Sequence, residues 1–562
     1  MNKRMQKELA RTGKPVYKLH FLGSAGGVTG SLMLVEMFSR EGVKRFLLDV
    51  GLHVDQQSLD FQNRLPKGMS GKDIDFVVIS HAHLDHSGYL PKLIKEGFTG
   101  PAYCTPATFD LMEILLPDSG FLQEEAVKRF NNRMTRRAEG GAQTGSPEAS
   151  AHRGGKQRGG SGGGKLSQKR GVKSGAPHSG GVAAPDASRL RKPLYTEEEA
   201  RSSLKCVKTI DYNVRTKLAE DIFVTFTDAG HILGSAVVTM ELGSGTNKRS
   251  LCFTGNVGRD NPPVLQTLAQ IKGADYVITE STYGNRVHKV RDRHARLAEI
   301  INKAYERAKL GKKDGAGVIL IPAFAVGRAQ IVLDDLRQLI AKKMIPNLKT
   351  YLDGRMSIKA TDVHRKHANL LNAETQAVIA AGSDPFATPR FELCREWTDS
   401  ARLQEPQSEP IIVVGSSGMA NGGRIVSHLA KRLSGPENTV VFVGYQGTGT
   451  LGNALVRFAE GNPFSERNST AHKANSDATP KTANVSGKSI RVRATVEFMS
   501  DYSGHADGVD ICRWLGKFKQ KPKNTFVVHG DDEALAGMRD QISTRLHWDV
   551  TIPKAREVFE LT

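Results

Sequence analysis

The sequence is poor in cysteine and has no long apolar run. Its five cysteines are scattered through 562 residues, and no two of them form a CxxC pair. This spacing excludes a thiolate zinc site and predicts reduced thiols that serve as small apolar residues. No apolar segment approaches the length of a membrane-spanning helix, and the charged start "MNKRMQKELARTGK" lacks the apolar centre of a secretory signal. We therefore expect a cytoplasmic protein with no membrane contact.

The chain is strongly basic, and part of its charge is concentrated in one segment. Lys and Arg number 79 against 59 Asp and Glu, which gives a formal net charge of +20. Such a balance in a soluble protein indicates a polyanionic partner. Residues 138–192 contain ten basic and three acidic side chains among many Gly, Ser and Ala. This composition predicts a flexible basic loop, which either contacts nucleic acid backbone or is a solvated linker without a partner.

Short β-branched or aromatic runs recur along the chain, and each ends in a polar or Gly-rich turn. Examples are "KRFLLDVG", "DFVVISHAHLDH" and "NTFVVHGD". Amphipathic patterns such as "RHARLAEIINKAYERAKLG" lie between some of them and predict helices. The alternation indicates α/β architecture, in which ligands gather beyond the carboxyl ends of strands. A second polar segment, residues 465–487, is predicted to be a loop.

The densest group of metal-binding side chains directly follows the apolar run 76–79. Within six positions it offers four candidate ligands, His81, His83, Asp85 and His86. Imidazole and carboxylate together suit zinc, with manganese and iron as alternatives. One short loop cannot surround a metal, so distant residues must complete the site. The candidates are His231 in "TDAGHILGSA" and His529 in "FVVHGDD", because each also follows an apolar run.

These motifs resemble those of a known family. "HAHLDHSG" with "DAGHILGSA" is similar to the metallo-β-lactamase fold, and "TESTYGNR", "IPAFAVGRAQ", "SSGMANGGRI", "GYQGTGTLG" and "SGHAD" resemble its β-CASP nucleases. The resemblance covers nearly the whole chain apart from the two polar loops. It implies an α/β protein, a metallo-β-lactamase αββα sandwich with an inserted α/β β-CASP domain. The implied boundaries are 15–285 for the first part of the sandwich, 286–487 for the insert and 488–562 for the returning part.

The resemblance also implies a role for individual residues. One zinc would be held by His81, His83 and His231, and a second by Asp85, His86 and His529. Asp49 would orient a ligand, and Glu280 would form hydrogen bonds near the second metal or its ligands. His505 would be the general acid, oriented by Asp507. The expected catalytic residues are thus His505, Asp85 and Glu280. A His at the position of His529 marks the RNA-directed members of the family.

A Gly-rich turn, "GSSGMANGGR", offers backbone N–H groups to a phosphate and precedes an amphipathic run. Together with two basic residues elsewhere, it gives the candidate RNA contacts Ser417, Gly418, Gly422, Gly423, Arg424, Arg328 and Lys359. For Arg328 and Lys359 a solvated charge is the alternative interpretation.

One position departs from the family pattern. Relatives have an Asp that bridges both metals in a Ser/Thr-Gly-Asp motif, whereas this chain has Asn256 in "FTGNVGRD". An amide has one neutral carbonyl oxygen and cannot neutralise charge between two cations. Three interpretations follow: one tightly bound zinc with a weak second one, two zinc ions of altered affinity, or a weakened relative retained for RNA binding.

The predicted function is that of a zinc-dependent ribonuclease, which hydrolyses phosphodiester bonds of mostly single-stranded RNA in RNA processing or decay. The alternative is a catalytically weakened, RNA-binding β-CASP subunit of a processing complex. A small-molecule hydrolase of lactamase or thioesterase type is a third hypothesis. RNA is the expected partner and a homodimer is one candidate assembly. The sequence leaves open whether cleavage is internal or from an end.

Overall fold

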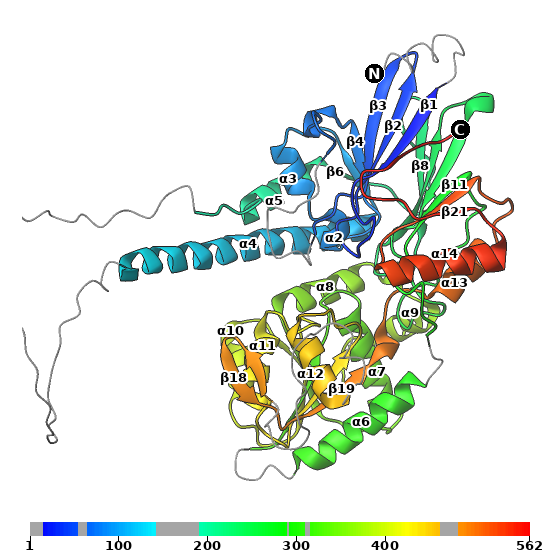
Figure 1. The fold of residues 1–562 in the computed structure, drawn as a ribbon. Coiled ribbons are helices and arrows are strands. Elements are labelled where there is room, and N and C mark those ends of the chain that lie inside the picture. Colours follow the sequence, from blue (N-terminus) through cyan, green and yellow to red (C-terminus); the bar gives the residue numbers. More distant parts are fainter. Residues whose placement is uncertain (1–14, 54–64, 142–189, 289–291, 310–314, 461–481) are drawn as a thin grey trace, which may run out of the picture.

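The computed structural model describes residues 15–53, 65–141, 190–288, 292–309, 315–460 and 482–562. They form two bodies stacked one on the other (Figure 1). The upper body contains both the first and the last described strands, and the lower body comes mostly from the middle of the sequence. Most of the two segments predicted as loops, 138–192 and 465–487, lies outside the described residues.

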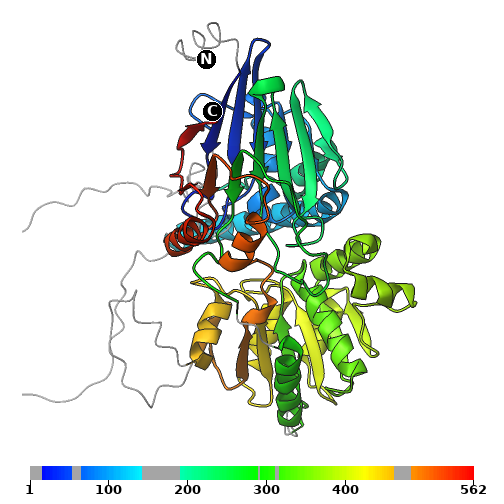
Figure 2. The same ribbon diagram turned by 90° about the vertical axis from the view of Figure 1, so that its right-hand side faces the viewer.

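Two sheets pack face to face in the upper body (Figure 2). The first has the strand order β22 (Val558–Glu560), β1 (Val16–Phe21), β2 (Met33–Ser39), β3 (Gly42–Leu48), β4 (Phe76–Val78), β5 (Ala102–Cys104) and β6 (Val207–Thr209). The second has the order β21 (Val550–Thr551), β20 (Asn524–Val527), β11 (Tyr276–Thr279), β10 (Arg249–Phe253), β9 (Ala236–Leu242), β8 (Ile222–Asp228) and β7 (Thr216–Ala219). Buried side chains from both sheets, such as Phe46 and Phe226, form a common core between them.

Helices cover the outer faces of this sandwich. Those that pack on the first sheet are α2 (Leu84–Ser87), α3 (Leu90–Lys95), α4 (Pro106–Gly141) and α5 (Glu197–Ser203). Those on the second sheet are α13 (Gly508–Leu515) and α14 (Asp532–Leu546). The predicted αββα sandwich is therefore confirmed. Among the described helices, none combines the length and the apolar character that crossing a bilayer requires.

The lower body is built on a parallel sheet. Its strand order is β14 (Phe391–Cys394), β13 (Lys349–Asp353), β15 (Ile411–Gly415), β12 (Val318–Pro322), β16 (Thr439–Val443) and β19 (Thr495–Met499). The surrounding helices are α6 (Arg293–Ala308), α7 (Arg328–Ala341), α8 (Arg355–Lys366), α9 (Ala373–Ala380), α10 (Trp397–Gln404), α11 (Arg424–Arg432) and α12 (Leu451–Glu460). The central strands are apolar throughout because both faces of the sheet are covered. The sheet includes β19, which follows the boundary expected at residue 487.

The ends of both predicted loops contain regular structure. Helix α4 continues to Gly141, past the expected loop start at residue 138. Strand β17 (Thr482–Val485) forms a hairpin with β18 (Lys488–Arg491), so the prediction of a loop up to residue 487 is wrong. Ala483 and Val485 alternate into the core of the lower body, and Ser486 and Gly487 both adopt positive φ in the turn. The apolar alternation is too short to be distinguished from a polar loop by pattern alone.

Candidate metal centre

Three histidines from two strand ends meet at one edge of the sandwich. His81 and His83 follow β4, and His231 follows β8. Nε2 of His81 lies 3.1 Å from Nδ1 of His83, and Nε2 of His231 lies 3.4 Å from the same atom. Nδ1 of His231 donates to the carbonyl of Gly504 at 3.1 Å, so Nε2 keeps its lone pair and faces the other two rings. The sequence prediction that distant strand ends converge here agrees with this geometry.

Burial controls the protonation of this first trio. It lowers the pKa of His83 to about 4 and that of His81 and His231 well below 6.5. At His81 and His231 the neighbouring rings of the trio act in the same direction, because each opposes a positive charge on the other, whereas Asp85 opposes the shift at His83. The three imidazoles are therefore neutral at physiological pH, which is the form that binds a metal ion.

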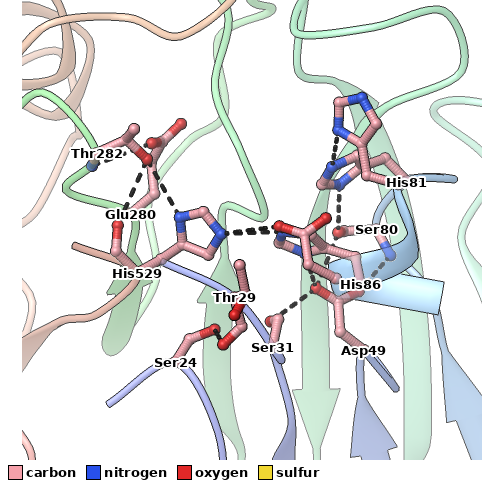
Figure 3. Close-up of polar contacts among 12 residues, drawn as sticks. Ser24, Thr29, Ser31, Asp49, Ser80, His81, His86, Glu280, Thr282 and His529 are labelled. Atoms are coloured by element: carbon pink, nitrogen blue, oxygen red, sulfur yellow. Dashed lines mark hydrogen bonds and ion pairs between the residues drawn. The ribbon is translucent and has the colours of Figure 1, made fainter. Parts of the chain in front are cut away.

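A second trio lies beside the first and contains the remaining predicted ligands. Nε2 of His86 is 3.2 Å from Nε2 of His529, and Oδ2 of Asp85 is 3.6 Å and 3.5 Å from these two atoms. His86 and His529 face each other across the site although 443 positions separate them in the sequence (Figure 3). Burial opposes a charge on Asp85, but the neighbouring histidines outweigh it and lower the pKa of its carboxyl. The trio thus offers two imidazole nitrogens and one carboxylate oxygen.

Hydrogen bonds behind the second trio fix how its rings point. Nδ1 of His86 donates to Oδ2 of Asp49 at 2.6 Å, and Nδ1 of His529 forms a hydrogen bond with the hydroxyl of Thr282 at 3.1 Å. Asp49 is fully buried and is held in turn by Ser31 and by Ser80 (Figure 3). Such outer partners set the tautomer of a ligating histidine and raise its basicity. The structure places Asp49 where the predicted role requires it.

The donor set of each trio suits zinc. In each trio the ligand atoms lie within 4.8 Å of one another, and the groups are imidazoles or a carboxylate. Asn256 is the remaining predicted ligand. It is 2% exposed, and its Oδ1 has no hydrogen-bond partner among the described residues. A buried carbonyl oxygen of this kind is rare and is available to a cation or a water molecule, but it adds no negative charge.

His505 is oriented by Glu280 and not by Asp507, which corrects the sequence-based expectation. Nδ1 of His505 donates to both carboxylate oxygens of Glu280, at 3.0 and 2.9 Å. Burial opposes a charge on Glu280, but His505 outweighs it and lowers the pKa of the carboxyl. Asp507 instead is the N-cap of α13, where it accepts from the backbone N–H groups of Val509 and Asp510. An acidic N-cap satisfies backbone donors that would otherwise be unpaired.

Three groups that position these side chains were not predicted. Thr282 holds His529, Ser80 forms a hydrogen bond with Nδ1 of His81 at 3.0 Å, and the carbonyl of Gly504 orients His231. Each lies within two positions of a residue that was predicted, in "TEST", "SHAH" and "SGHAD". Adjacency to a motif was the only available signal, because Ser, Thr and Gly at such positions are common in loops.

The candidate RNA contacts fall into different environments. The Gly-rich turn, with Ser417, Gly418, Gly422 and Gly423, connects β15 to α11, and Gly423 is the N-cap of that helix with positive φ. Arg424 does not remain free for a phosphate. Its guanidinium pairs with Asp353 at 2.9 Å and donates to the carbonyls of Cys394 and Arg395. The prediction that Arg424 binds RNA is therefore corrected to a structural role inside the lower body.

The two other basic candidates differ sharply from each other. Arg328, the first residue of α7, is buried, and its Nε has no partner among the described residues. Burial lowers its pKa to about 10, and no carboxylate contributes to the shift. It lies against Gly504, whose carbonyl orients His231. Lys359 is exposed on α8, where its charge acts on Asp118 of α4, so it matches the alternative interpretation of a solvated charge.

Comparison with known proteins agrees with this arrangement. Residues 26–155 match the metallo-beta-lactamase superfamily, 329–455 the Beta-Casp domain, and 489–553 the "Zn-dependent metallo-hydrolase RNA specificity domain". The chain is 28% identical to ribonuclease TTHA0252 of Thermus thermophilus over 93% of its own length and 95% of that protein. It is also 28% identical to the transcription termination factor FttA of Methanosarcina mazei, over 89% of this chain and 66% of that protein.

Proposed function

We propose that this chain, which belongs to the β-CASP family of metallo-β-lactamase-fold proteins, is a zinc-dependent ribonuclease that hydrolyses phosphodiester bonds of RNA. The observation that carries the proposal is the convergence of two trios of metal-binding side chains beside a carboxylate-paired histidine. The similarity to ribonuclease TTHA0252 along nearly the full length of both proteins supports it. So does the net charge of +20, which suits a polyanionic substrate. A cytoplasmic location and a homodimer remain predictions.

In this proposal each trio holds one zinc ion. Bound zinc lowers the pKa of a coordinated water and stabilises the negative charge that develops during phosphodiester cleavage. The protein supplies neutral imidazoles from one trio and the carboxylate of Asp85 from the other. Asp49, Ser80, Thr282 and Gly504 hold the ligands in orientation by the hydrogen bonds described above. The ligands are thus fixed before a metal binds, which favours a defined geometry.

His505 is the group that can deliver a proton to the leaving oxygen. Its ring centroid lies 4.4 Å from that of His231, which places it next to the first trio. Because Glu280 accepts from Nδ1, Nε2 is the atom available to the substrate. The Glu280 carboxylate also stabilises the protonated ring before transfer. Catalytic histidines of other enzymes are held by a carboxylate in the same way.

Substrate specificity tests the proposal directly. Purified protein with zinc is expected to hydrolyse single-stranded RNA faster than duplex RNA, since splayed nucleotides reach a recessed metal centre more easily. A small aryl ester and a β-lactam are the comparison substrates. Turnover of these small molecules without any cleavage of RNA would support the metallo-hydrolase alternative and contradict the ribonuclease.

A pair of conservative substitutions separates the two acidic residues near His505. Glu280→Gln is expected to lower kcat for RNA about 10- to 100-fold, because an amide cannot stabilise the charged ring. Asp507→Asn should change kcat less than threefold, since Asn caps a helix about as well as Asp. Rates at saturating RNA, compared with thermal melting of both variants, check this. Equal losses in the two variants would argue against Glu280 as the positioning residue.

Arg328 is expected to neutralise an RNA phosphate. Arg328→Met retains much of the buried volume but removes the charge, so RNA affinity should fall while the metal content stays unchanged. The slope of log affinity against log salt should fall by about one unit. Titrations of RNA binding at several salt concentrations measure this, with Lys359→Met as the matched control. An unchanged slope in Arg328→Met would exclude the phosphate contact.

Asn256→Asp tests the departure from the family pattern. We expect the carboxylate to tighten the binding of the more weakly held zinc at least tenfold, because it adds negative charge where the amide has none. At saturating zinc the RNA cleavage rate should stay within a few-fold of the natural protein. Zinc titrations followed by activity measure both quantities. Activity that arises only in the Asp variant would instead favour a non-catalytic RNA-binding subunit, which the similarity to a ribonuclease does not favour.

A further inference from the structure

A pocket beside His505 is lined by aromatic rings from both bodies. It has a volume of about 300 Å³, and its lining residues are Tyr283, Arg286, Val287, His288, Tyr445, Phe498 and Ser500. The first four follow β11 in the upper body, whereas the last three lie beyond β16 and around the end of β19 in the lower body. None of these side chains has a role in the chemistry proposed above.

Tyr445 is an exposed aromatic member of this lining. Its side chain is 47% exposed, although most large apolar side chains of the described residues are buried. Tyr283 and Arg286 line the same pocket as Tyr445. Burial raises the pKa of Tyr445, Tyr283 and Asp531 act in the same direction, and Arg286 opposes them. The guanidinium of Arg286 lies 5.7 Å from the centroid of the Tyr283 ring. Two phenol rings and a cation therefore border one opening.

The pocket is joined to the proton-donating histidine by direct contacts. The rings of Tyr283 and His505 have centroids 6.1 Å apart, and Nε2 of His288 donates to the carbonyl of His505 at 3.0 Å. Tyr283 also follows Thr282, whose hydroxyl holds His529. The pocket thus adjoins His505, so a polymer bound at the metal centre can extend into it.

The chemistry of the lining selects among possible occupants. Its described lining residues include no carboxylate and no carboxamide, so none of them forms a bidentate pair with one base edge, and the carboxylate whose charge acts on Tyr445, Asp531, is not among them. Aromatic rings stack on any base, and a neighbouring Arg contacts the backbone. A flat, weakly discriminating site of this kind suits a nucleobase and not a peptide or lipid.

We propose that this pocket binds a nucleobase of the RNA next to the cleaved linkage, with the base stacked on Tyr445 and Tyr283 and with Arg286 contacting the backbone. The inference rests on the proposed function, since it assumes that RNA reaches the metal centre. It adds a positioning element on the lower body, which explains how that body contributes to the placement of the scissile phosphate.

The test compares intact RNA with RNA that carries one abasic nucleotide at successive positions. Binding is measured on metal-free protein, so no cleavage is required. Wild-type protein should lose about 5- to 150-fold in affinity when the abasic position falls in the pocket, and little elsewhere. Tyr445→Ala should show the same loss with intact RNA and no further loss with the abasic RNA. Tyr445→Phe, which keeps the ring, should bind like wild type.

Trp397→Ala is the matched control, because Trp397 is also a large exposed aromatic residue of the lower body, at 54% exposure, but does not line the pocket. Its RNA affinity should not change. If every abasic RNA binds wild type as tightly as intact RNA, or if wild type binds no RNA, the pocket proposal is overturned. If wild type binds RNA without cleaving it when zinc is present, the ribonuclease proposal fails while the abasic comparison still decides the pocket. The abasic series needs no variant, so misfolding of Tyr445→Ala cannot obscure the result.

Discussion

Removal of bound metal is expected to abolish RNA hydrolysis, and zinc alone is expected to restore it. Six side chains from three separate segments place their ligand atoms in two compact groups, and three of the histidines are held neutral by burial. Metal coordination lowers the pKa of water by several units and so makes hydroxide available near neutral pH. Dialysis against a chelator, followed by an RNA cleavage assay with and without added zinc, measures this effect.

Two controls make the metal experiment decisive. Metal-free protein should still melt cooperatively, because the two sheets of the upper body share an apolar core that does not depend on the ligands. It should also still bind RNA, since Arg328 and the general positive charge remain. If metal removal abolished both cleavage and folding, the loss of cleavage would be explained by unfolding and not by a role of the metal in the reaction. Full cleavage by protein that contains no metal would contradict the mechanism.

His505→Ala is expected to lower kcat for RNA cleavage about 10²- to 10⁴-fold, the range found when a general acid is removed. RNA affinity and zinc content should not change, because His505 belongs to neither trio. The defect should be larger than that of Glu280→Gln, which leaves the proton donor in place and removes only its partner. Single-turnover rates with prebound RNA isolate the chemical step.

The matched control for this variant is His547→Asn. His547 is an exposed histidine at the end of α14, and Asn tolerates the positive φ at that position. Its cleavage rate should equal that of the natural protein. A His505→Ala variant with an unchanged single-turnover rate would show that another group protonates the leaving oxygen.

Much of the metal centre could be predicted from the sequence because its residues follow strands. His231 and His529 were identified as ligands from their position after apolar runs, and the carboxyl ends of β4 in the first sheet and of β8 and β20 in the second do meet at one edge of the sandwich. The role of Asp49 came from the family resemblance alone, and in the structure Asp49 follows β3 and pairs with His86. For the two histidines a local pattern was sufficient, because the packing of the two sheets brings these strand ends together.

The errors concern residues whose partners lie far away in the sequence. Asp507 stands two positions from His505, but it caps a helix, whereas Glu280 reaches His505 from 225 positions away. The partner of Arg424 is also distant in the sequence. Asp353 lies 71 positions away and pairs with the Arg424 guanidinium inside the lower body. The type of a residue and its neighbours in the sequence do not show which carboxylate will pair with a given His or Arg in the fold. Asp507 stands at the start of an amphipathic run, and this position predicts a helix N-cap as strongly as its closeness to His505 predicts a role beside that histidine.

The most direct test of the metal centre is anomalous X-ray diffraction at the zinc edge from crystals of the zinc-loaded protein. The account predicts one peak about 2.0–2.1 Å from Nε2 of His81, Nδ1 of His83 and Nε2 of His231, the usual distances of zinc from imidazole nitrogen. A second peak is predicted between Asp85, His86 and His529. Strong zinc peaks at other places, with none at either trio, would contradict it.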